Sequence, residues 1–203
     1  MGPPHREPHR EPREPLSFKD SLRRLLNPLV SLLSTMRVRP DTLTFLGWGL
    51  SIYAAVLFGL GHAKGAGAMM LLAGLFDALD GAVARETGLM TSFGAFLDST
   101  LDRLSESAVF VGIVFFYAAA SRPYEALLAG AAMTFSLLTS YTRARAEGLG
   151  LKCEVGILER AGRVTILSVL SLTGFVTLGV GLVAAGALVT TIQRMLHVYR
   201  ATR

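Results

Sequence analysis

The stretch DALDGAVARETGLMTSFGAFLDSTLD, residues 77–102, carries four aspartates inside or beside runs that are too apolar for an ordinary soluble surface. The aspartates are Asp77, Asp80, Asp98 and Asp102. Ionisable side chains within membrane segments are costly and by default mark a functional site. The stretch therefore predicts a membrane protein whose functional site is built on carboxylates.

The composition of the whole chain is that of a polytopic membrane protein. Of the 203 residues, 51% are hydrophobic and 17% are charged, and the charges are concentrated between long apolar runs. A soluble helical domain would spread its charge over the surface. The net charge of +5 lies beside apolar runs, which favours lipid headgroups or phosphorylated substrates over nucleic acid. A single cysteine, Cys153, excludes an internal disulfide and a CxxC metal site.

The N-terminal region is expected to form a tail and an interfacial helix. Residues 1–15 repeat a His/Arg-Glu-Pro unit, so residues 1–16 are expected to be a disordered tail before a membrane domain of residues 17–203. Residues 18–36 place apolar side chains at three- and four-residue spacing opposite Lys19, Arg23 and Arg24. This pattern predicts an amphipathic helix in the membrane interface, bent at Pro28.

Six transmembrane helices are predicted between residues 42 and 200. The first, residues 42–61, has twenty residues without a formal charge, enough to cross about 30 Å of hydrocarbon. Asp41 or Thr42 is expected to cap it. Gly179-Val180 is expected to be the turn before the last span. The remaining spans are expected at residues 66–85, 93–119, 124–143, 161–178 and 181–200.

The orientation of the chain in the membrane follows from its lysines and arginines. Given the six predicted spans, nearly all of them lie in segments on the same side of the membrane as the N-terminal tail. The positive-inside rule therefore predicts that both termini are cytoplasmic. The acid-bearing ends of the second and third spans then face the cytoplasm as well. The predicted fold class is an all-α integral protein of the plasma membrane, with six spans and an N-terminal interfacial helix.

The four carboxylates are predicted to converge on a metal centre. Asp77 and Asp80 are three residues apart and Asp98 and Asp102 four apart, so each pair shares one helix face. A loop near residues 86–93 should make the two helices antiparallel neighbours. Carboxylates packed this closely need a compensating cation. Oxygen ligands with positions open for a phosphate suit Mg²⁺, and two such ions could clamp a pyrophosphate.

The spacing D-x2-D-G-x2-A-R-x8-G-x3-D-x3-D resembles the signature of the CDP-alcohol phosphatidyltransferases. The resemblance implies an enzyme with two Mg²⁺ ions per active site, Mn²⁺ being an alternative ion. In such an enzyme an acceptor hydroxyl attacks the β-phosphorus of a CDP-linked lipid and CMP leaves. The resemblance also implies a homodimer. The matching positions are Asp77, Asp80, Gly81, Ala84, Arg85, Gly94, Asp98 and Asp102.

The resemblance further implies roles for individual residues. Asp77, Asp80 and Asp98 would ligate metal, and Asp102 would be the general base, also touching the second metal. The residues that match donor-binding positions are Pro40, Asp41, Thr42, Leu43, Gly81, Arg85 and Thr91.

Basic residues near the ends of the fourth and fifth predicted spans indicate a phosphorylated acceptor. The segments SYTRARAE (140–147) and GILERAGR (156–163), with Arg194 in the last span, resemble those of the phosphatidylinositol-phosphate synthases. Arg143 stands where lysine is usual, and Ala161-Gly162 replace Pro-Glu. The resemblance implies inositol phosphate as acceptor. The residues implied to bind its phosphate are Ser140, Arg143, Arg160 and Arg194.

Three alternatives remain open at this level. A phosphatidylglycerophosphate synthase also takes a phosphorylated acceptor, and an ether-lipid version of the inositol reaction is equally compatible. A cation or proton transporter could use intramembrane carboxylates. Transport sites, however, tend to lie near the membrane midplane, whereas these acids cluster near one membrane face beside glycine and arginine.

Overall fold

The computed structural model describes residues 18–36 and 39–203, and all regular structure in these two ranges is helical. The predicted tail of residues 1–16 and the side chains of Lys19, Arg23 and Arg24 lie outside what the structure describes. The helices are α1 (Phe18–Thr35), α2 (Pro40–Gly59), α3 (Ala63–Thr87), α4 (Ser92–Ala119), α5 (Pro123–Glu147), α6 (Arg160–Leu172) and α7 (Val176–Ala201).

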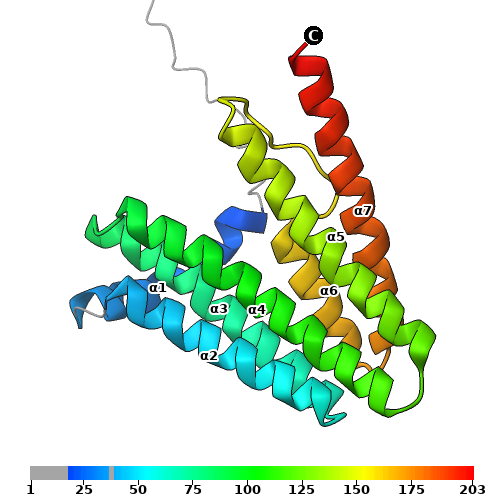
Figure 1. The fold of residues 1–203 in the computed structure, drawn as a ribbon. Coiled ribbons are helices and arrows are strands. Elements are labelled where there is room, and N and C mark those ends of the chain that lie inside the picture. Colours follow the sequence, from blue (N-terminus) through cyan, green and yellow to red (C-terminus); the bar gives the residue numbers. More distant parts are fainter. Residues whose placement is uncertain (1–17, 37–38) are drawn as a thin grey trace, which may run out of the picture.

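The long helices form two groups that meet at one end of the molecule and diverge at the other (Figure 1). In the first group α2 packs against α3 and α4, and in the second α7 packs against α5 and α6. The two groups are joined by α3 against α6 and by α4 against α5. Their shared apolar core includes Phe58, Met70, Ile113 and Val183. A second, smaller apolar cluster of Val30, Leu43, Leu79 and Val83 packs beside the acid-bearing end of α3.

The relation between α3 and α4 differs from the prediction. The two helices are antiparallel, but each packs along α2, and they make few close backbone contacts with each other. The side chains that line the space between them include Thr44 and Ser51 of α2. This arrangement provides room for carboxylates between α3 and α4, which direct packing of the two helices would remove.

Helix α1 lies against the first group. It continues through Pro28, and its Val30 is buried with Leu43, Leu79 and Val83. On the same helix Leu32 and Met36 are exposed. The predicted helix is therefore present, and Val30 attaches it to α2 and α3.

Within the part of the chain that the structure describes, three helices, α2, α3 and α7, are long and apolar enough to cross a membrane by length and composition. Helices α4 and α5, with 28 and 25 residues, are long enough to cross a membrane but are not among these three. Helix α6 has 13 residues, which at 1.5 Å per residue span about 20 Å. The structure thus gives an all-helical fold with three candidate spans, and the six-span arrangement stays a prediction.

Two predicted boundaries were wrong. The chain turns at Gly174, whose φ of 87° is the left-handed conformation that glycine adopts readily, and not at Gly179-Val180. Gly179 lies within α7, where an added Cβ would be 3.2 Å from Leu170 Cβ. The cap of α2 is Arg39, ahead of Pro40, because proline fits the first helical position, where its missing N–H is not needed.

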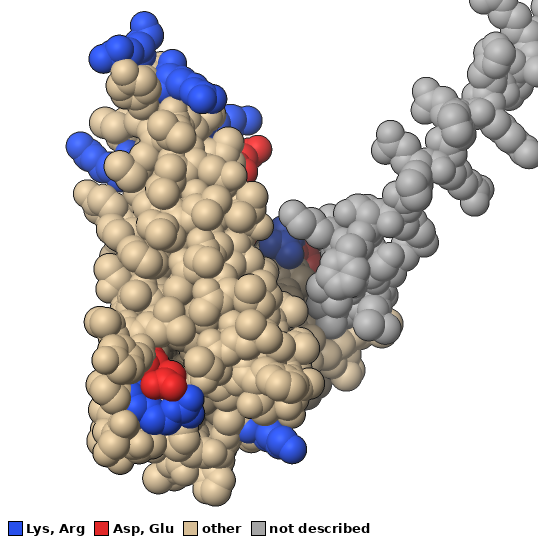
Figure 2. Space-filling model, turned by 90° about the vertical axis from the view of Figure 1, so that its right-hand side faces the viewer, with Lys and Arg blue, Asp and Glu red and all other residues tan. Residues whose placement is uncertain are grey.

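The surface is consistent with a lipid environment. Figure 2 shows one face on which charged side chains gather at the top and in smaller groups near the bottom, with a broad uncharged region between them. Large apolar side chains on the surface, such as Phe115, Leu127 and Leu178, are more than half exposed. An exposed apolar surface of this extent is typical of contact with hydrocarbon.

The close packing of α2 and α4 depends on Gly112. A Cβ at this position would overlap the backbone carbonyl of Ala55, which cannot move aside as a side chain would. We expect Gly112→Ala to lower the free energy of unfolding by about 1–3 kcal/mol or more. Thermal unfolding of the purified protein in detergent measures this effect. Gly130→Ala on α5, where an added Cβ meets nothing within 4 Å, is the matched control. Equal melting temperatures for the two variants would contradict the prediction.

Candidate active site

Three of the four aspartates come together between α3 and α4. One carboxylate oxygen from each of Asp77, Asp98 and Asp102 lies within 4.8 Å of the other two. Asp98 Oδ1 is buried and has no hydrogen-bond partner among the described residues. A buried, unpaired carboxylate oxygen is costly unless a cation or donor meets it. The residues present therefore fit a divalent cation bound by oxygen ligands.

Asp80 lies beside this group but is held differently. It is 6% exposed, and its Oδ2 accepts a hydrogen bond of 2.7 Å from Thr44 Oγ1 on α2. Asp80 and the three grouped aspartates line one cavity, which we call the acid cavity. Its walls come from α2, α3 and α4 and from Arg160. Sequence reasoning missed Thr44, because nothing local links it to an aspartate 36 positions away.

Thr44 orients Asp80 in the way that partners of metal ligands commonly do. We expect Thr44→Val to weaken Mn²⁺ binding to the purified protein by about tenfold, because the Asp80 carboxylate loses its donor. Electron paramagnetic resonance of free Mn²⁺ measures the affinity. Thr44→Ser keeps the hydroxyl and should bind the ion as the wild type does. Unchanged affinity in Thr44→Val would show that the hydrogen bond has no part in metal binding.

Arg160 lies among the acids. Its Nη2 is 2.7 Å from Asp102 Oδ1 and its Nη1 is 3.3 Å from Asp77 Oδ2. The sequence predicted this arginine at the acceptor phosphate, and the structure pairs it with two predicted metal ligands. Since Arg160 begins α6, the first residue of this short helix is tied to α3 and to α4.

A second cavity, of about 330 Å³, adjoins the acids and is lined by several arginines; we call it the cationic cavity. All four predicted acceptor residues line it, as does Asp102. The arginines around it are Arg103, Arg143, Arg160, Arg163 and Arg194. Arg103 and Arg163 were not predicted, because the sequence alone does not tell an arginine that lines a cavity from one that lies at the membrane surface.

Arg194 is the most firmly held of the predicted acceptor residues. It is 3% exposed, its Nε donates to the carbonyl of Val155 at 2.9 Å, and its Nη1 donates to the carbonyl of Thr139 at 2.6 Å. By contrast, the Arg143 side chain is 43% exposed and pairs with Glu147 at 2.9 Å. Arg194 is therefore fixed before any ligand binds, and Arg143 is free to adjust.

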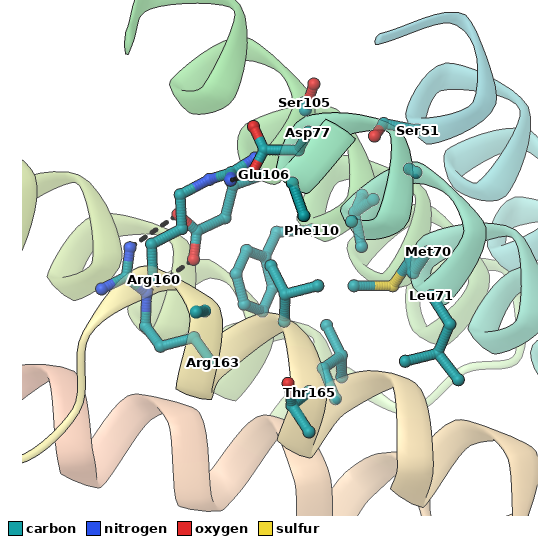
Figure 3. A pocket seen from close by; sticks show the side chains of 17 residues that line it. Ser51, Met70, Leu71, Asp77, Ser105, Glu106, Phe110, Arg160, Arg163 and Thr165 are labelled. Atoms are coloured by element: carbon teal, nitrogen blue, oxygen red, sulfur yellow. Dashed lines mark hydrogen bonds and ion pairs between the residues drawn. The ribbon is translucent and has the colours of Figure 1, made fainter. Parts of the chain in front are cut away.

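A third cavity, also about 330 Å³, extends from Asp77 and Arg160 between α3, α4 and α6; we call it the apolar cavity (Figure 3). Its walls are mostly apolar and include Met70, Leu71 and Phe110. The view also shows Arg163 forming ion pairs with Glu106 at the side of this cavity. A mostly apolar cavity that ends at carboxylates and an arginine suits a molecule with a lipid part and a charged part.

The predicted donor residues lie at the ends of α2, α3 and α4. Arg85 folds back over Gly81, where an added Cβ would lie 3.3 Å from Arg85 Nη1. Thr91 caps α4 by accepting a hydrogen bond of 2.9 Å from the N–H of Gly94. An added Cβ at Gly94 would meet Thr91 Oγ1 at 3.0 Å and Asp41 Oδ1 at 4.0 Å. The helix starts of α2 and α4 are therefore close to each other.

Leu43, one of the residues predicted to lie at the donor site, has a buried side chain. It is 3% exposed and packs in the cluster of Val30, Leu79 and Val83. The neighbouring Pro40, Asp41 and Thr42 are partly or fully exposed at the start of α2. Leu43 thus holds the segment in place, since its side chain faces away from solvent.

Comparison with known proteins gives a consistent family assignment. The family model of the CDP-alcohol phosphatidyltransferases matches residues 37–196. The archaetidylinositol phosphate synthase of Methanothermobacter thermautotrophicus is 36% identical over 190 residues, which cover 90% of this chain and 93% of that protein.

Solved structures agree with this match. The phosphatidylinositol phosphate synthase of Mycobacterium tuberculosis with CDP-DAG bound has a TM-score of 0.78 and 33% identity, covering 87% of this chain and 94% of that one. The same protein in complex with manganese and citrate gives a TM-score of 0.77 at 33% identity, covering 85% and 88%. The likeness therefore includes both the acid-bearing helices and the helices that carry the cationic cavity.

Proposed function

The chain belongs to the CDP-alcohol phosphatidyltransferase family, and we propose that it transfers a phosphatidyl group, or its ether-lipid equivalent, from a CDP-linked lipid to inositol phosphate, releasing CMP. The observation that carries this proposal is the arrangement of the three cavities. Arg160 lines the acid, cationic and apolar cavities, so that all three meet at one point. A transfer from a lipid to a phosphorylated alcohol needs such a meeting of apolar, metal-binding and anion-binding surfaces.

Metal binding is assigned to the four aspartates. Asp77, Asp98 and Asp102 would hold a divalent cation, with Asp80 completing a two-ion site. Held by these aspartates, Mg²⁺ or Mn²⁺ would supply the positive charge that offsets the pyrophosphate of the donor and polarises its phosphorus. The manganese complex of the Mycobacterium tuberculosis protein supports a divalent ion in this family.

Asp102 is the proposed general base. It lines both the acid cavity and the cationic cavity, so it is placed between the donor phosphate and the acceptor. Its carboxylate takes the proton of the acceptor hydroxyl as the new oxygen–phosphorus bond forms and the bond to CMP breaks. Arg160, which pairs with Asp102 at 2.7 Å, must turn toward the cationic cavity in this step.

The cationic cavity is the proposed acceptor site. Ser140, Arg143, Arg160 and Arg194 would bind the phosphate of the acceptor, because guanidinium groups pair well with phosphate oxygens. The nucleotide of the donor would lie over Gly81 and Arg85, near Pro40, Asp41, Thr42 and Thr91. Its lipid chains would enter the apolar cavity. The CDP-DAG complex of the Mycobacterium tuberculosis protein supports a CDP-linked lipid as donor.

The proposed location of the enzyme is the plasma membrane. We place the acid-bearing end at the cytoplasmic face of the plasma membrane, with six spans and both termini inside, on the distribution of basic residues. A homodimer is proposed on the family resemblance. Transfer is favoured over ion transport because the chain belongs to an enzyme family and the acids lie beside an anion-binding cavity.

An acceptor panel tests the proposed reaction. Purified protein in lipid is given CDP-diacylglycerol or its ether-linked counterpart with inositol phosphate, glycerol phosphate, inositol or serine, and CMP release is measured. We expect release to require Mg²⁺ or Mn²⁺ and inositol phosphate. Release with glycerol phosphate alone would establish the phosphatidylglycerophosphate alternative. Release that is independent of every acceptor would overturn the transferase function.

A further inference from the structure

A buried ion pair beside the active site has no role in the proposed reaction. Arg163 is 2% exposed and Glu106 carries a side chain that is 10% exposed. The guanidinium and carboxylate join through two hydrogen bonds, Nε to Oε1 at 2.7 Å and Nη2 to Oε2 at 2.8 Å. A buried pair is often no more stable than apolar residues of the same size. Its presence here therefore indicates a need for a defined geometry.

The pair is one of two parallel links between α4 and α6. Asp102 and Glu106 are four residues apart on α4, and Arg160 and Arg163 are three apart on α6, so each set shares a face. The two links are Arg160–Asp102 at 2.7 Å and Arg163–Glu106. By close backbone contacts α6 packs on α3 and α7, so its attachment to α4 is mainly through these side chains.

The pair also lies between two of the cavities. Arg163 lines the apolar cavity and the cationic cavity, and Glu106 lines the apolar one (Figure 3). It therefore forms part of the wall between the proposed lipid site and the proposed acceptor site. A two-point guanidinium–carboxylate contact restricts rotation about both side chains, which a single contact does not.

We propose that Glu106 and Arg163 are a positioning pair for the acceptor site: they fix the first turn of α6 on α4, so that the Arg160 guanidinium stays at the meeting point of the cavities when its link to Asp102 opens. This inference rests on the proposed function. In the reaction Asp102 must release Arg160 to take a proton, whereas Glu106 keeps Arg163. The Arg163–Glu106 link thus keeps α6 at the same distance from α4 when the Arg160–Asp102 link opens.

Kinetics of two variants test the proposal. The double variant Glu106→Leu with Arg163→Met removes both charges, so no buried charge is left unpaired, and we expect it to fold. We expect its KM for inositol phosphate to rise about tenfold or more, since a displacement of about 1 Å can cost up to 100-fold. The KM for the CDP-linked lipid should stay within about twofold of wild type. Arg163→Lys keeps the charge balance but only one contact, and should show a smaller rise.

The controls separate positioning from stability and from the function itself. Melting temperature in detergent is recorded for each variant, and Glu125→Gln, which breaks the exposed Arg122–Glu125 pair of 2.6 Å, should change neither KM. If the double variant is folded and keeps both KM values, the pair is structural only and the proposal is overturned. If the double variant does not fold, Arg163→Lys takes its place: a folded Arg163→Lys variant that keeps both KM values also overturns the proposal. Failure of the wild type to use any acceptor would instead refute the proposed function, whatever the variants do.

Discussion

Asp102→Asn is expected to reduce CMP release at saturating donor and acceptor by roughly 1,000-fold, because general bases contribute about 10²- to 10⁴-fold. The amide keeps the shape of the side chain but cannot take the acceptor proton. Asp102 lines both the acid and the cationic cavities, and its carboxylate holds Arg160 at 2.7 Å. The loss should therefore appear in kcat, while affinity for the CDP-linked lipid changes little.

Asp98→Asn is the comparison that separates a base from a metal ligand. Asp98 belongs to the same three-aspartate group but does not line the cationic cavity. Its replacement should raise the Mg²⁺ concentration needed for half-maximal rate, and excess Mg²⁺ should recover part of the activity. Excess Mg²⁺ should not recover Asp102→Asn. Glu125→Gln, an exposed change at the far end of α5, should behave as wild type. A residual rate above about a tenth in Asp102→Asn would contradict its role as base.

The local parts of the fold and site could be predicted from sequence. The spacing of Asp77 and Asp80, and of Asp98 and Asp102, placed each pair on one helix face, and the structure has both pairs in long helices. Clustered arginines near two helix ends indicated an anion site, and the structure brings Ser140, Arg143, Arg160 and Arg194 around one cavity. These features depend on periodicity and charge within one helix, which sequence displays directly.

The parts that depend on contacts between helices could not be predicted. In a membrane protein the side of a helix that faces lipid is as apolar as the side that faces the core, so the polar–apolar pattern that orients soluble helices is lost. Nothing local therefore indicated that α3 and α4 would each pack along α2 with few close backbone contacts to each other, or that Leu43 would be buried. The same reason hides Thr44 beside Asp80 and Glu106 beside Arg163, which are 36 and 57 positions apart.

Arg160 shows where prediction from one helix fell short. Its sequence context indicated a phosphate ligand, and it does line the cationic cavity. The structure also pairs it with Asp77 and Asp102 across two other helices. Arg160→Ala should consequently disturb metal binding and donor binding along with acceptor binding. Arg160→Ala is therefore a poor probe of the acceptor site alone. A better probe is a residue that lines the cationic cavity but neither the acid cavity nor the apolar cavity.

Arg194 meets that requirement, and its replacement should weaken binding of the acceptor without weakening binding of the donor. It lines the cationic cavity but neither the acid cavity nor the apolar one. A hydrogen bond to a charged group contributes about 1.5–3 kcal/mol, so Arg194→Ala should raise the KM for inositol phosphate by roughly 10- to 150-fold. The KM for the CDP-linked lipid should stay within about twofold.

Arg194→Lys tests whether charge alone suffices. Arg194 is anchored on the carbonyls of Val155 and Thr139 through Nε and Nη1, so only part of its guanidinium is left for a ligand. A lysine cannot reproduce this two-carbonyl anchor while presenting a charge, so the variant should also bind inositol phosphate more weakly than wild type.

Arg145→Ala is the matched control. Arg145 is exposed and does not line the cationic cavity, so its replacement should leave both KM values unchanged. Equal losses for donor and acceptor in Arg194→Ala would show that Arg194 supports the fold of the site and does not bind the acceptor phosphate.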